Sequence, residues 1–529
     1  MAVACSPTLL LLASVTARSR LRTDNARPAR ADAANPDGVD AHPELSPIPS
    51  RARRRLILAI CCMSLLIVGL DNTIVNVALP SIGRELHAPV SGLQWTVDAY
   101  TLVLASLLML AGSTADRLGR KRVFAAGLVV FSLGSLLCSA APTLGWLIAF
   151  RMVQAVGGSM LNPVAMGIIR NVFTDPRERA WAIGMWGATV GVSLALGPVV
   201  GGALVDSAGW RSVFWINVPV GLAALALTLR FVPESRAPRP RRIDPVGQGL
   251  VIVLLASLTY AIIEAPSAGW SSAQTVGLFA LAAAALAGLI AYERRRAEPL
   301  LELRFFRSVP FSSASAIAVC SFAALGGFLF LNTLYLQEVR HQSPFTAGLY
   351  TLPIAAMTLI FAPLSGRLVG RRGPRTGLLV GGVGIMLGGA LLTGLTRTTP
   401  LTDLLPAYFV FGIGFGMVNP PITVTAVVGM PPAQAGVAAA IASTSRQVGQ
   451  TLGVAVVGAI AAAGLGVVGP GFVQSSRAGW WIVAGCGFAV LALGLFSTTR
   501  WAQATARRVA DDSAGRERAQ DADGELVGV

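Results

Sequence analysis

The stretch LILAICCMSLLIVGLDNTIVNVALP, residues 56–80, joins a long apolar run to a single carboxylate, Asp71. A helix that crosses the hydrocarbon core of a bilayer needs about 20 mostly apolar residues, and this run is long enough. A carboxylate inside a membrane helix is costly and usually functional. The stretch therefore predicts a membrane-spanning helix that carries a functional acid.

The composition of the whole chain agrees with a membrane protein. Of its 529 residues, 54% are hydrophobic and 13% are charged, and the mean hydropathy is +0.65. These values exclude an ordinary soluble enzyme, a disordered protein and a nucleic-acid-binding module. The formal net charge of +16 therefore needs an explanation other than nucleic-acid binding.

Apolar runs recur between about residue 56 and residue 499, separated by short polar breaks. Several runs contain Gly and Pro, which membrane helices tolerate better than soluble helices do. We expect an all-α integral membrane protein with 14 transmembrane helices. The runs cover residues 56–79, 92–111, 123–141, 145–169, 180–205, 212–232, 246–264, 274–293, 311–336, 346–366, 376–396, 404–427, 435–464 and 478–499.

Arginine and lysine are distributed unequally between the breaks on the two predicted sides of the membrane. The side that includes the break before the first run holds 28 of them, against five on the opposite side. Basic loops are retained on the cytoplasmic side. The net charge therefore records topology, with both chain termini in the cytoplasm, as an even number of spans requires. The five residues on the opposite side are Arg84, Arg211, Arg340, Arg397 and Arg477.

The breaks also predict a division into two related halves. ADRLGRKR (115–122), after the second run, is echoed by GRLVGRR (366–372), after the tenth. Such repetition is common in transporters built from two helical bundles. The expected parts are a disordered cytoplasmic tail (1–50), an N-terminal six-helix bundle (51–232), a linker with two extra transmembrane helices (233–310), a C-terminal six-helix bundle (311–499) and a second disordered tail (500–529).

Three charged side chains inside apolar runs are candidates for proton coupling. A carboxylate in such surroundings can bind and release a proton near neutral pH. Arg151, in RMVQAVGGS (151–159), must face a carboxylate, a carbonyl or a water-filled cavity, and it shares a helix face with Gln154. The acids are Asp71 and Asp98. A structural, hydrogen-bonded Asp71 and an Asp98 at the outer membrane interface are the open alternatives.

Two glycine-containing motifs are candidates for conformational change. GSTADRLGRKR (112–122) forms a tight connector in which Asp116 can cap a helix or pair with a neighbouring helix. The basic residues of the connector also fix its position on the cytoplasmic side. The fifth run carries two GxxxG pairs and a proline, which allow close helix packing or a hinge. The residues are Gly112, Asp116, Arg117, Gly119 and Arg120 in the connector, and Gly187, Gly191, Gly197, Pro198, Gly201 and Gly202 in the fifth run.

A polar stripe in the thirteenth run is a candidate for the wall of a substrate cavity. Offsets of three, four and seven residues place its four polar side chains on one helix face. The stripe lines a central cavity or, alternatively, marks the cytoplasmic end of the helix. Aromatic residues can contact an apolar substrate, although more often they face lipid or pack. The candidates are Ser443, Arg446, Gln447 and Gln450, with the aromatic residues Tyr350 and Phe415.

Sequence motifs of enzymes and of metal sites are not found in a credible context. There is no Walker A loop, zinc-protease motif, nucleophile elbow or Rossmann fingerprint. The three histidines and six cysteines form no metal-like cluster, and we expect cysteines in apolar runs to be small buried hydrophobic residues. We therefore expect no enzyme activity, no cofactor, no metal and no ATP-driven step.

Taken together, the motifs resemble the major facilitator superfamily and, more narrowly, its 14-spanner drug:proton antiporter family. The resemblance covers about residues 56–499. It implies two six-helix bundles plus two extra helices, and export of amphipathic, often cationic compounds driven by inward proton flow. The motifs are LDNTIVNVALP (70–80), GSTADRLGRKR (112–122), RMVQAVGGS (151–159), GPVVGG (197–202), WRSVFWINVPVG (210–221) and RQVGQ (446–450).

The resemblance also implies roles for individual residues. Asp71, Asp98 and Arg151 would serve coupling or substrate binding, the connector would be a conformational switch, and GPVVGG would be the antiporter signature. Gln154 and Asn217, each inside one of these motifs, join the candidates for the substrate cavity. Some relatives that export divalent cations carry extra acids in spans 10 and 13. Here those spans have none, which argues against dications and leaves monovalent, neutral or anionic substrates.

These observations predict a monomeric multi-pass protein of the plasma membrane that exports small molecules in exchange for protons. Its partners would be the substrate, protons and the lipid bilayer, and no nucleic acid. A dedicated exporter of one endogenous metabolite, such as an antibiotic or a siderophore, is the alternative within transport. A membrane sensor without transport is the alternative from another class, and charges inside the spans argue against it.

Overall fold

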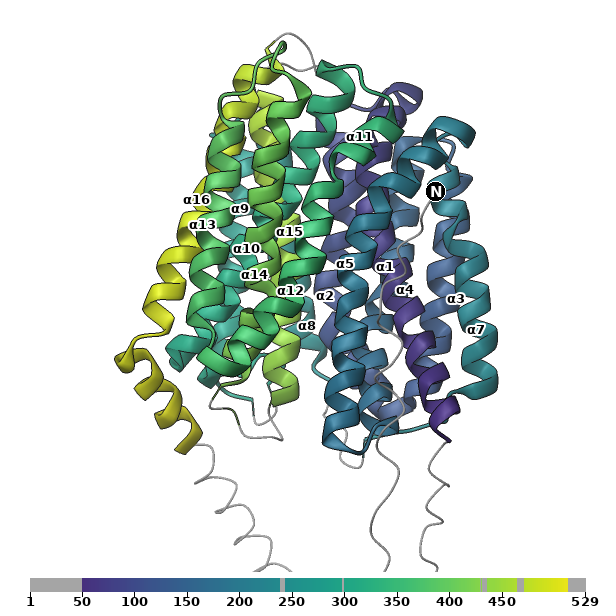
Figure 1. Cartoon of the computed structure of the whole chain (residues 1–529), viewed down its shortest axis with the longest axis vertical. Coiled ribbons are helices and arrows are strands. Elements are labelled where there is room, and N and C mark those ends of the chain that lie inside the picture. Colours follow the sequence, from purple (N-terminus) through teal and green to yellow (C-terminus); the bar gives the residue numbers. More distant parts are fainter. Residues whose placement is uncertain are drawn as a thin grey trace, which may run out of the picture. The chain divides into compact units, whose positions relative to one another are not determined.

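The computed structural model describes residues 50–237, 243–296, 299–428, 430, 435–463 and 471–511. Every regular element within these ranges is a helix, which confirms the all-α prediction there, and Figure 1 shows the long helices running side by side in one general direction. Of the two predicted tails, residues 1–49 and 512–529 lie outside the described ranges.

The first bundle contains the six predicted spans, and the sixth is broken at Ile216. The first helix begins because the Ser50 hydroxyl accepts a hydrogen bond from the backbone N of Arg53, 3.3 Å away. Asp175 caps the fifth helix in the same way, at 2.9 Å. The elements are α1 (Arg51–Leu86), α2 (Val90–Leu118), α3 (Arg120–Ser139), α4 (Leu144–Val172), α5 (Pro176–Ala208), α6 (Ser212–Trp215) and α7 (Asn217–Phe231).

The second bundle begins at Val309, two residues before the predicted boundary, and its second span is also broken. That break falls at Thr351, just ahead of Pro353, which has no N–H to continue the helical hydrogen bonds. The short helix η1 (Leu303–Arg307) precedes the bundle. The elements of the bundle are α10 (Val309–Leu334), η2 (Tyr335–Val339), α11 (Pro344–Tyr350), α12 (Leu352–Arg372), α13 (Arg375–Leu392), η3 (Leu401–Asp403), α14 (Leu404–Val427), α15 (Ala435–Ala463) and α16 (Phe472–Ser497).

The two extra helices, α8 (Pro245–Ala268) and α9 (Ala273–Glu293), pack against each other. α8 also packs against α2 from the first bundle and α15 from the second. The Trp95 indole N–H donates to Glu264 over 3.1 Å, and the Gln248 amide donates to the Ser106 carbonyl over 2.5 Å. The linker predicted at 233–310 therefore holds α8 where it contacts both bundles.

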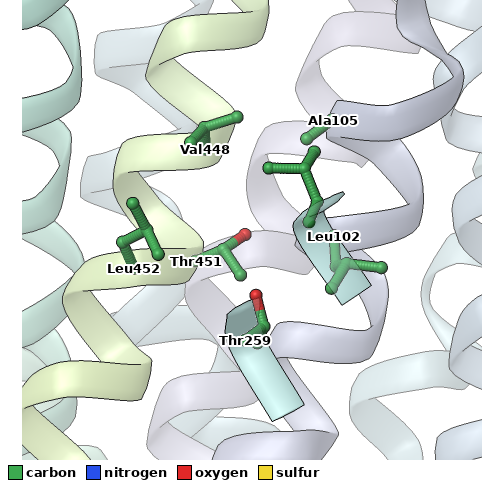
Figure 2. Close-up of a pocket in the computed structure, with 7 residues that line it drawn as sticks. Leu102, Ala105, Thr259, Val448, Thr451 and Leu452 are labelled. Atoms are coloured by element: carbon green, nitrogen blue, oxygen red, sulfur yellow. The ribbon is translucent and has the colours of Figure 1, made fainter. Parts of the chain in front are cut away.

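A narrow apolar gap, too small to hold a water molecule, lies where these three helices meet. Figure 2 shows Leu102 of α2, Thr259 of α8 and Thr451 of α15 around it. The Thr451 hydroxyl donates to the Thr101 hydroxyl of α2 over 2.8 Å. The space is a packing defect between α2, α8 and α15, because its walls are almost entirely aliphatic.

Thirteen helical segments of the described residues are long and apolar enough to cross a membrane. α15, which corresponds to the thirteenth predicted run, is not among them. Its 29 residues are sufficient in length, but its polar stripe lowers the hydropathy. The number of fourteen spans therefore stays a prediction.

Residues 500–511 form a helix, so the prediction that the disordered tail begins at residue 500 is wrong. Ala502, Ala506 and Val509 recur at helical spacing and are buried. The Thr505 hydroxyl accepts a hydrogen bond from the backbone N of Val309 over 3.0 Å. The sequence is rich in Ala and Arg, which favour helices, and a docked apolar face stabilises so short a segment.

The hydrogen bonds that described residues form between the two bundles lie toward one end of the helices. We call it the outer end, where α1 ends and α2 begins. There the Gln337 amide donates to the Val77 carbonyl over 2.9 Å, and the Gln94 amide donates to the Ala455 carbonyl over 2.8 Å. The opposite end, where α1 begins, is called the inner end. The structure therefore shows the bundles joined at their outer ends.

Tight packing between α1 and α5 depends on glycines. A Cβ atom on Gly197 would lie 1.9 Å from the Thr73 hydroxyl, and one on Gly201 would lie 2.4 Å from Cγ1 of Ile74. Real side chains never approach so closely, so only glycine allows this helix contact. The pair Gly197 and Gly201 therefore packs as its spacing predicts.

The other glycines of α5 serve different contacts or none. A Cβ on Gly202 would lie 2.4 Å from the Pro344 carbonyl of α11, and one on Gly191 would lie 3.2 Å from Leu359 of α12. Nothing lies within 4 Å of a Cβ on Gly187. Gly187 and Gly191 therefore do not form one shared packing face, and Gly202 and Gly191 instead face the second bundle.

We expect Gly201→Ala to lower the free energy of unfolding by roughly 1–3 kcal/mol, the usual cost of overpacking. Gly187→Ala is the matched control, since its methyl group meets open space and alanine favours a helix. Thermal unfolding of the detergent-purified proteins measures both. Equal stability of the two variants would contradict this account of the α1–α5 contact.

Candidate functional site

Asp71 and Arg151 form an ion pair inside the first bundle. Asp71 lies on α1 and Arg151 on α4, and their Oδ2 and Nη1 atoms are 2.5 Å apart. Their side chains are 0% and 1% exposed. The sequence predicted that Arg151 faces a carboxylate, a carbonyl or water. In the structure it faces the carboxylate of Asp71, in the first span.

Two amide side chains bind the other carboxylate oxygen of Asp71. Gln154 donates to Oδ1 over 2.8 Å, and Asn217 of α7 donates to the same atom over 2.9 Å. Both amides also donate to the Ser135 hydroxyl of α3, over 2.6 and 3.1 Å. Gln154 and Asn217, predicted as candidates for the cavity, are therefore wholly buried partners of Asp71 in this structure.

The remaining contacts of Arg151 extend the network to a fifth helix. Its Nη1 also donates to Gln154 Oε1 over 2.7 Å, and its Nε donates to the Thr96 carbonyl of α2 over 3.2 Å. The guanidinium lies over the Tyr100 ring, 4.1 Å from the ring centre. We call Asp71, Arg151, Gln154, Asn217 and Ser135 the buried polar network.

The buried polar network explains how two charges persist among apolar helices. The attraction within a buried ion pair offsets the cost of desolvation only when the remaining lone pairs and protons also have partners. Here both oxygens of Asp71 accept hydrogen bonds. Removing either charge would therefore leave its partner buried and uncompensated.

Asp98 differs from Asp71 because neither of its oxygens has a partner among the described residues. It is completely buried on α2, so it does not lie on an exposed rim. Gln94 and Thr101 flank it on the same face, and both bond to α15 of the second bundle. Asp98 therefore lies on the face of α2 that meets the other half.

The connector between α2 and α3 is held by ion pairs at the inner end. Asp116 and Arg120 pair at 2.8 Å, and Arg120 also donates to the Gly167 carbonyl of α4 over 3.4 Å. Glu234, after α7, accepts from the backbone N of Lys121 over 3.1 Å. Gly119 has a φ of +115°, and a Cβ there would lie 2.6 Å from Glu234, so the turn requires glycine.

Other predicted connector residues take simpler positions. Arg117 lies in the last turn of α2, and a Cβ on Gly112 would make ordinary contact with Pro163 of α4 at 3.7 Å. Glu234 was not predicted, because it lies in an unremarkable stretch that no motif marks. The same holds for Ser135, one polar residue in an apolar run, and for the ring of Tyr100.

The polar stripe of α15 lies in the second bundle and faces more than one neighbour. Arg446 donates to the Thr423 hydroxyl of α14 over 2.5 Å, and Gln450 is buried against Gly326 of α10. Ser443 and Gln447 are half-buried on the same helix. Phe415 contacts Phe322 edge to face at 5.2 Å, close to Arg446, whereas Tyr350 ends α11. The predicted cavity residues thus divide between two bundles.

The described residues contain no group of three or more His, Cys, Asp or Glu side chains that could hold a metal ion. Asp71 and Asp116 are each paired with an arginine, whereas Asp98 has no partner among the described residues.

The chain is similar to proteins of a known family. The model of the Major Facilitator Superfamily matches residues 61–454. Multidrug resistance protein Stp of Mycobacterium tuberculosis is 39% identical over 403 residues, 76% of this chain and 75% of Stp. The tetracenomycin C resistance and export protein of Streptomyces glaucescens is 37% identical over 442 residues, 82% of this chain and 80% of that protein.

A solved structure shares the fold. The bacterial homolog of the human lysosomal transporter Spinster, in an inward-facing and unoccupied conformation, aligns with a TM-score of 0.60 at 18% identity. The alignment covers 87% of this chain and 99% of that one. The likeness concerns the arrangement of helices alone.

We expect Asp71→Asn and Arg151→Gln each to lower the free energy of unfolding by roughly 3 kcal/mol, since each leaves one buried charge unpaired. The double variant, which has no unpaired charge, should lose less than the sum of the two. Thermal unfolding in detergent, read as a double-mutant cycle, measures the coupling. Additive losses would show that the two charges do not depend on each other.

Proposed function

Because this chain belongs to the major facilitator superfamily, we propose that it is a secondary active exporter that exchanges amphipathic small molecules for protons. It is a multi-pass membrane transporter, and its relatives include drug efflux and antibiotic export proteins. The observation that carries proton coupling is the buried ion pair of Asp71 and Arg151. The proposal involves no enzymatic step, and a single chain is the unit of transport.

The proposal places fourteen spans in the plasma membrane, with both termini in the cytoplasm. It counts α15 as a span in addition to the thirteen apolar segments, because α15 packs between α10 and α2 along its length. The basic breaks support the orientation, since they lie at the inner end. The joined outer ends of the bundles would then face the outside of the cell.

Protonation of Asp71 would remove the charge that Arg151 needs. The helices that share the buried polar network, α1, α3, α4 and α7, could then shift relative to one another. A ligand changes a conformational equilibrium only through its different affinities for the states. A proton that binds one state of this pair better than the other fulfils that condition, and its movement inward would drive export.

Asp98 is the second proton-binding group in this proposal. An ionised carboxylate without partners is costly inside a membrane protein, whereas its neutral form is not. Asp98 lies between Gln94 and Thr101, the two residues that bond to α15. Gain or loss of its proton would therefore alter the fit of α2 against the second bundle.

The connector would act as a latch at the inner end. Asp116, Arg120 and Glu234 link α2, α3, α4 and the segment after α7. When the helices of the first bundle rearrange, these contacts would either all break or all persist. The glycine and proline residues of α5 would permit the accompanying sliding against α1 and α11.

A dedicated exporter of one metabolite is the second candidate. The similarity to a Streptomyces protein for tetracenomycin C resistance and export favours it. A strain that lacks this protein should retain its own product inside the cell if export is dedicated, and should become sensitive to several unrelated drugs if export is broad. Metabolite measurement by mass spectrometry, together with a panel of drugs, separates the two.

We expect Asp71→Asn to abolish proton-coupled efflux while the protein stays in the membrane, since the neutral amide cannot carry the proton. The measurement is uptake of a fluorescent drug into inverted vesicles, with and without an imposed proton gradient. Asp403→Asn, in the exposed connection before α14, is the matched control and should transport normally.

Protein amounts in the vesicles are compared by immunoblot. The double variant with Arg151→Gln provides a second protein without an unpaired buried charge. Undiminished gradient-driven uptake by Asp71→Asn would refute the assignment of Asp71 to coupling. If uptake by the wild type were the same with and without the proton gradient, proton exchange itself would be refuted.

A further inference from the structure

The second bundle carries a basic side chain well inside a spanning helix. Arg446 lies roughly 16 Å along α15 from Ala435, at 1.5 Å per residue. The polar residues next to it in the sequence, Ser445 and Gln447, are uncharged. A guanidinium at such a depth is costly and usually functional. Its positive charge requires a negatively charged partner.

No acidic side chain is such a partner among the described residues. Arg446 forms no ion pair there, and one nitrogen, Nη2, donates to the Thr423 hydroxyl over 2.5 Å. Its Nε atom is buried and has no partner in the same part of the chain. Arg151 is the contrast, because Asp71 balances its charge. The first bundle is therefore neutral at its central arginine, and the second is not.

Arg446 is not completely covered by protein atoms. Its side chain is partly exposed and Thr423 is exposed, although both lie on spanning helices, α15 and α14. A charged group does not face lipid at this depth, since water or a partner is required. The exposed side of Arg446 therefore requires water or a solute as a partner.

An aromatic pair lies beside the guanidinium. The Phe322 ring of α10 is 6.0 Å from Cζ of Arg446, and the buried Phe415 of α14 packs against it edge to face at 5.2 Å. A half-buried ring supported from behind can stack on a flat apolar group. A guanidinium binds carboxylates with two parallel hydrogen bonds, and Arg446 has donors to spare.

We propose that Arg446 and Phe322, supported by Phe415, recognise a planar aromatic substrate that carries a negative charge as a carboxylate or phenolate. The inference rests on the proposed function and adds the charge class of the substrate. The substrate would supply the anion that the second bundle lacks, while its ring would lie against Phe322. A cationic drug would instead meet an uncompensated positive charge.

The test is binding of two dyes to the purified full-length protein, measured by fluorescence anisotropy. Fluorescein and rhodamine 6G share a xanthene ring but are anionic and cationic. We expect Arg446→Gln to weaken fluorescein binding at least about tenfold, as for one lost charge-assisted contact. Rhodamine 6G binding should be unchanged or stronger, because a repulsive charge is removed. Arg446→Lys should bind fluorescein with an affinity between those of the wild type and Arg446→Gln, because lysine keeps the charge but cannot form two parallel hydrogen bonds.

Arg477→Gln is the matched control for the loss of one positive charge. Arg477 lies near the outer end of α16 and donates to the Thr393 carbonyl over 3.1 Å, away from α14 and α15. This variant should bind both dyes as the wild type does. Equal weakening of both dyes by Arg446→Gln would overturn the proposal, because it would show a structural role. Failure of the wild type to bind fluorescein would overturn it too.

A competition experiment on the wild type tests the proposal even if the Arg446 variants do not fold. Naphthalene-1-carboxylate should displace bound fluorescein at a concentration at least about tenfold lower than its neutral carboxamide. Equal displacement by the two compounds would overturn the proposal. Binding of fluorescein without gradient-driven transport in vesicles would leave the anion site standing and refute the proposed function instead.

Discussion

Asp71 and Arg151 hold opposite charges 2.5 Å apart in a place where neither side chain reaches water. Each charge alone would cost too much in this environment, so each requires the other. Gln154 and Asn217 complete the requirement by donating to the second oxygen of Asp71, and both also donate to the Ser135 hydroxyl. Because these groups come from α1, α3, α4 and α7, the positions of four helices depend on one electrostatic contact.

The remaining architecture allows that contact to change without unfolding the bundle. Glycines of α5 permit the close approach of α5 to α1. Ion pairs hold the connector at the inner end, where a charged side chain has a smaller desolvation cost than at the centre of the bundle. The two bundles are joined by hydrogen bonds at their outer ends, and α8 contacts both. A change at Asp71 can therefore reach the contact between bundles through rigid helices.

The sequence predicted those features that depend on a charge standing out against an apolar background. Asp71 and Arg151 were identifiable for that reason, and the motif of Arg151 also contains Gln154. Asn217 lies in a separate motif, at 210–221, which the family resemblance marked. Ser135 and Glu234 could not be found, because a single serine or a glutamate between helices carries no pattern of its own. The pairing of Asp71 with Arg151, rather than Asp98 with Arg151, depends on helix packing. The helix at 500–511 was missed because its docking on Val309 stabilises it more than composition suggests.

The central claim is that the network around Asp71 exchanges a proton when substrate binds. Proton release from purified protein in weakly buffered detergent solution, followed with a pH electrode while a transported drug is added, tests it most directly. We expect the wild type to release protons in proportion to the drug bound, and Asp71→Asn to release fewer at equal occupancy. Substrate binding without proton release by the wild type, or undiminished release by the variant, would contradict the account.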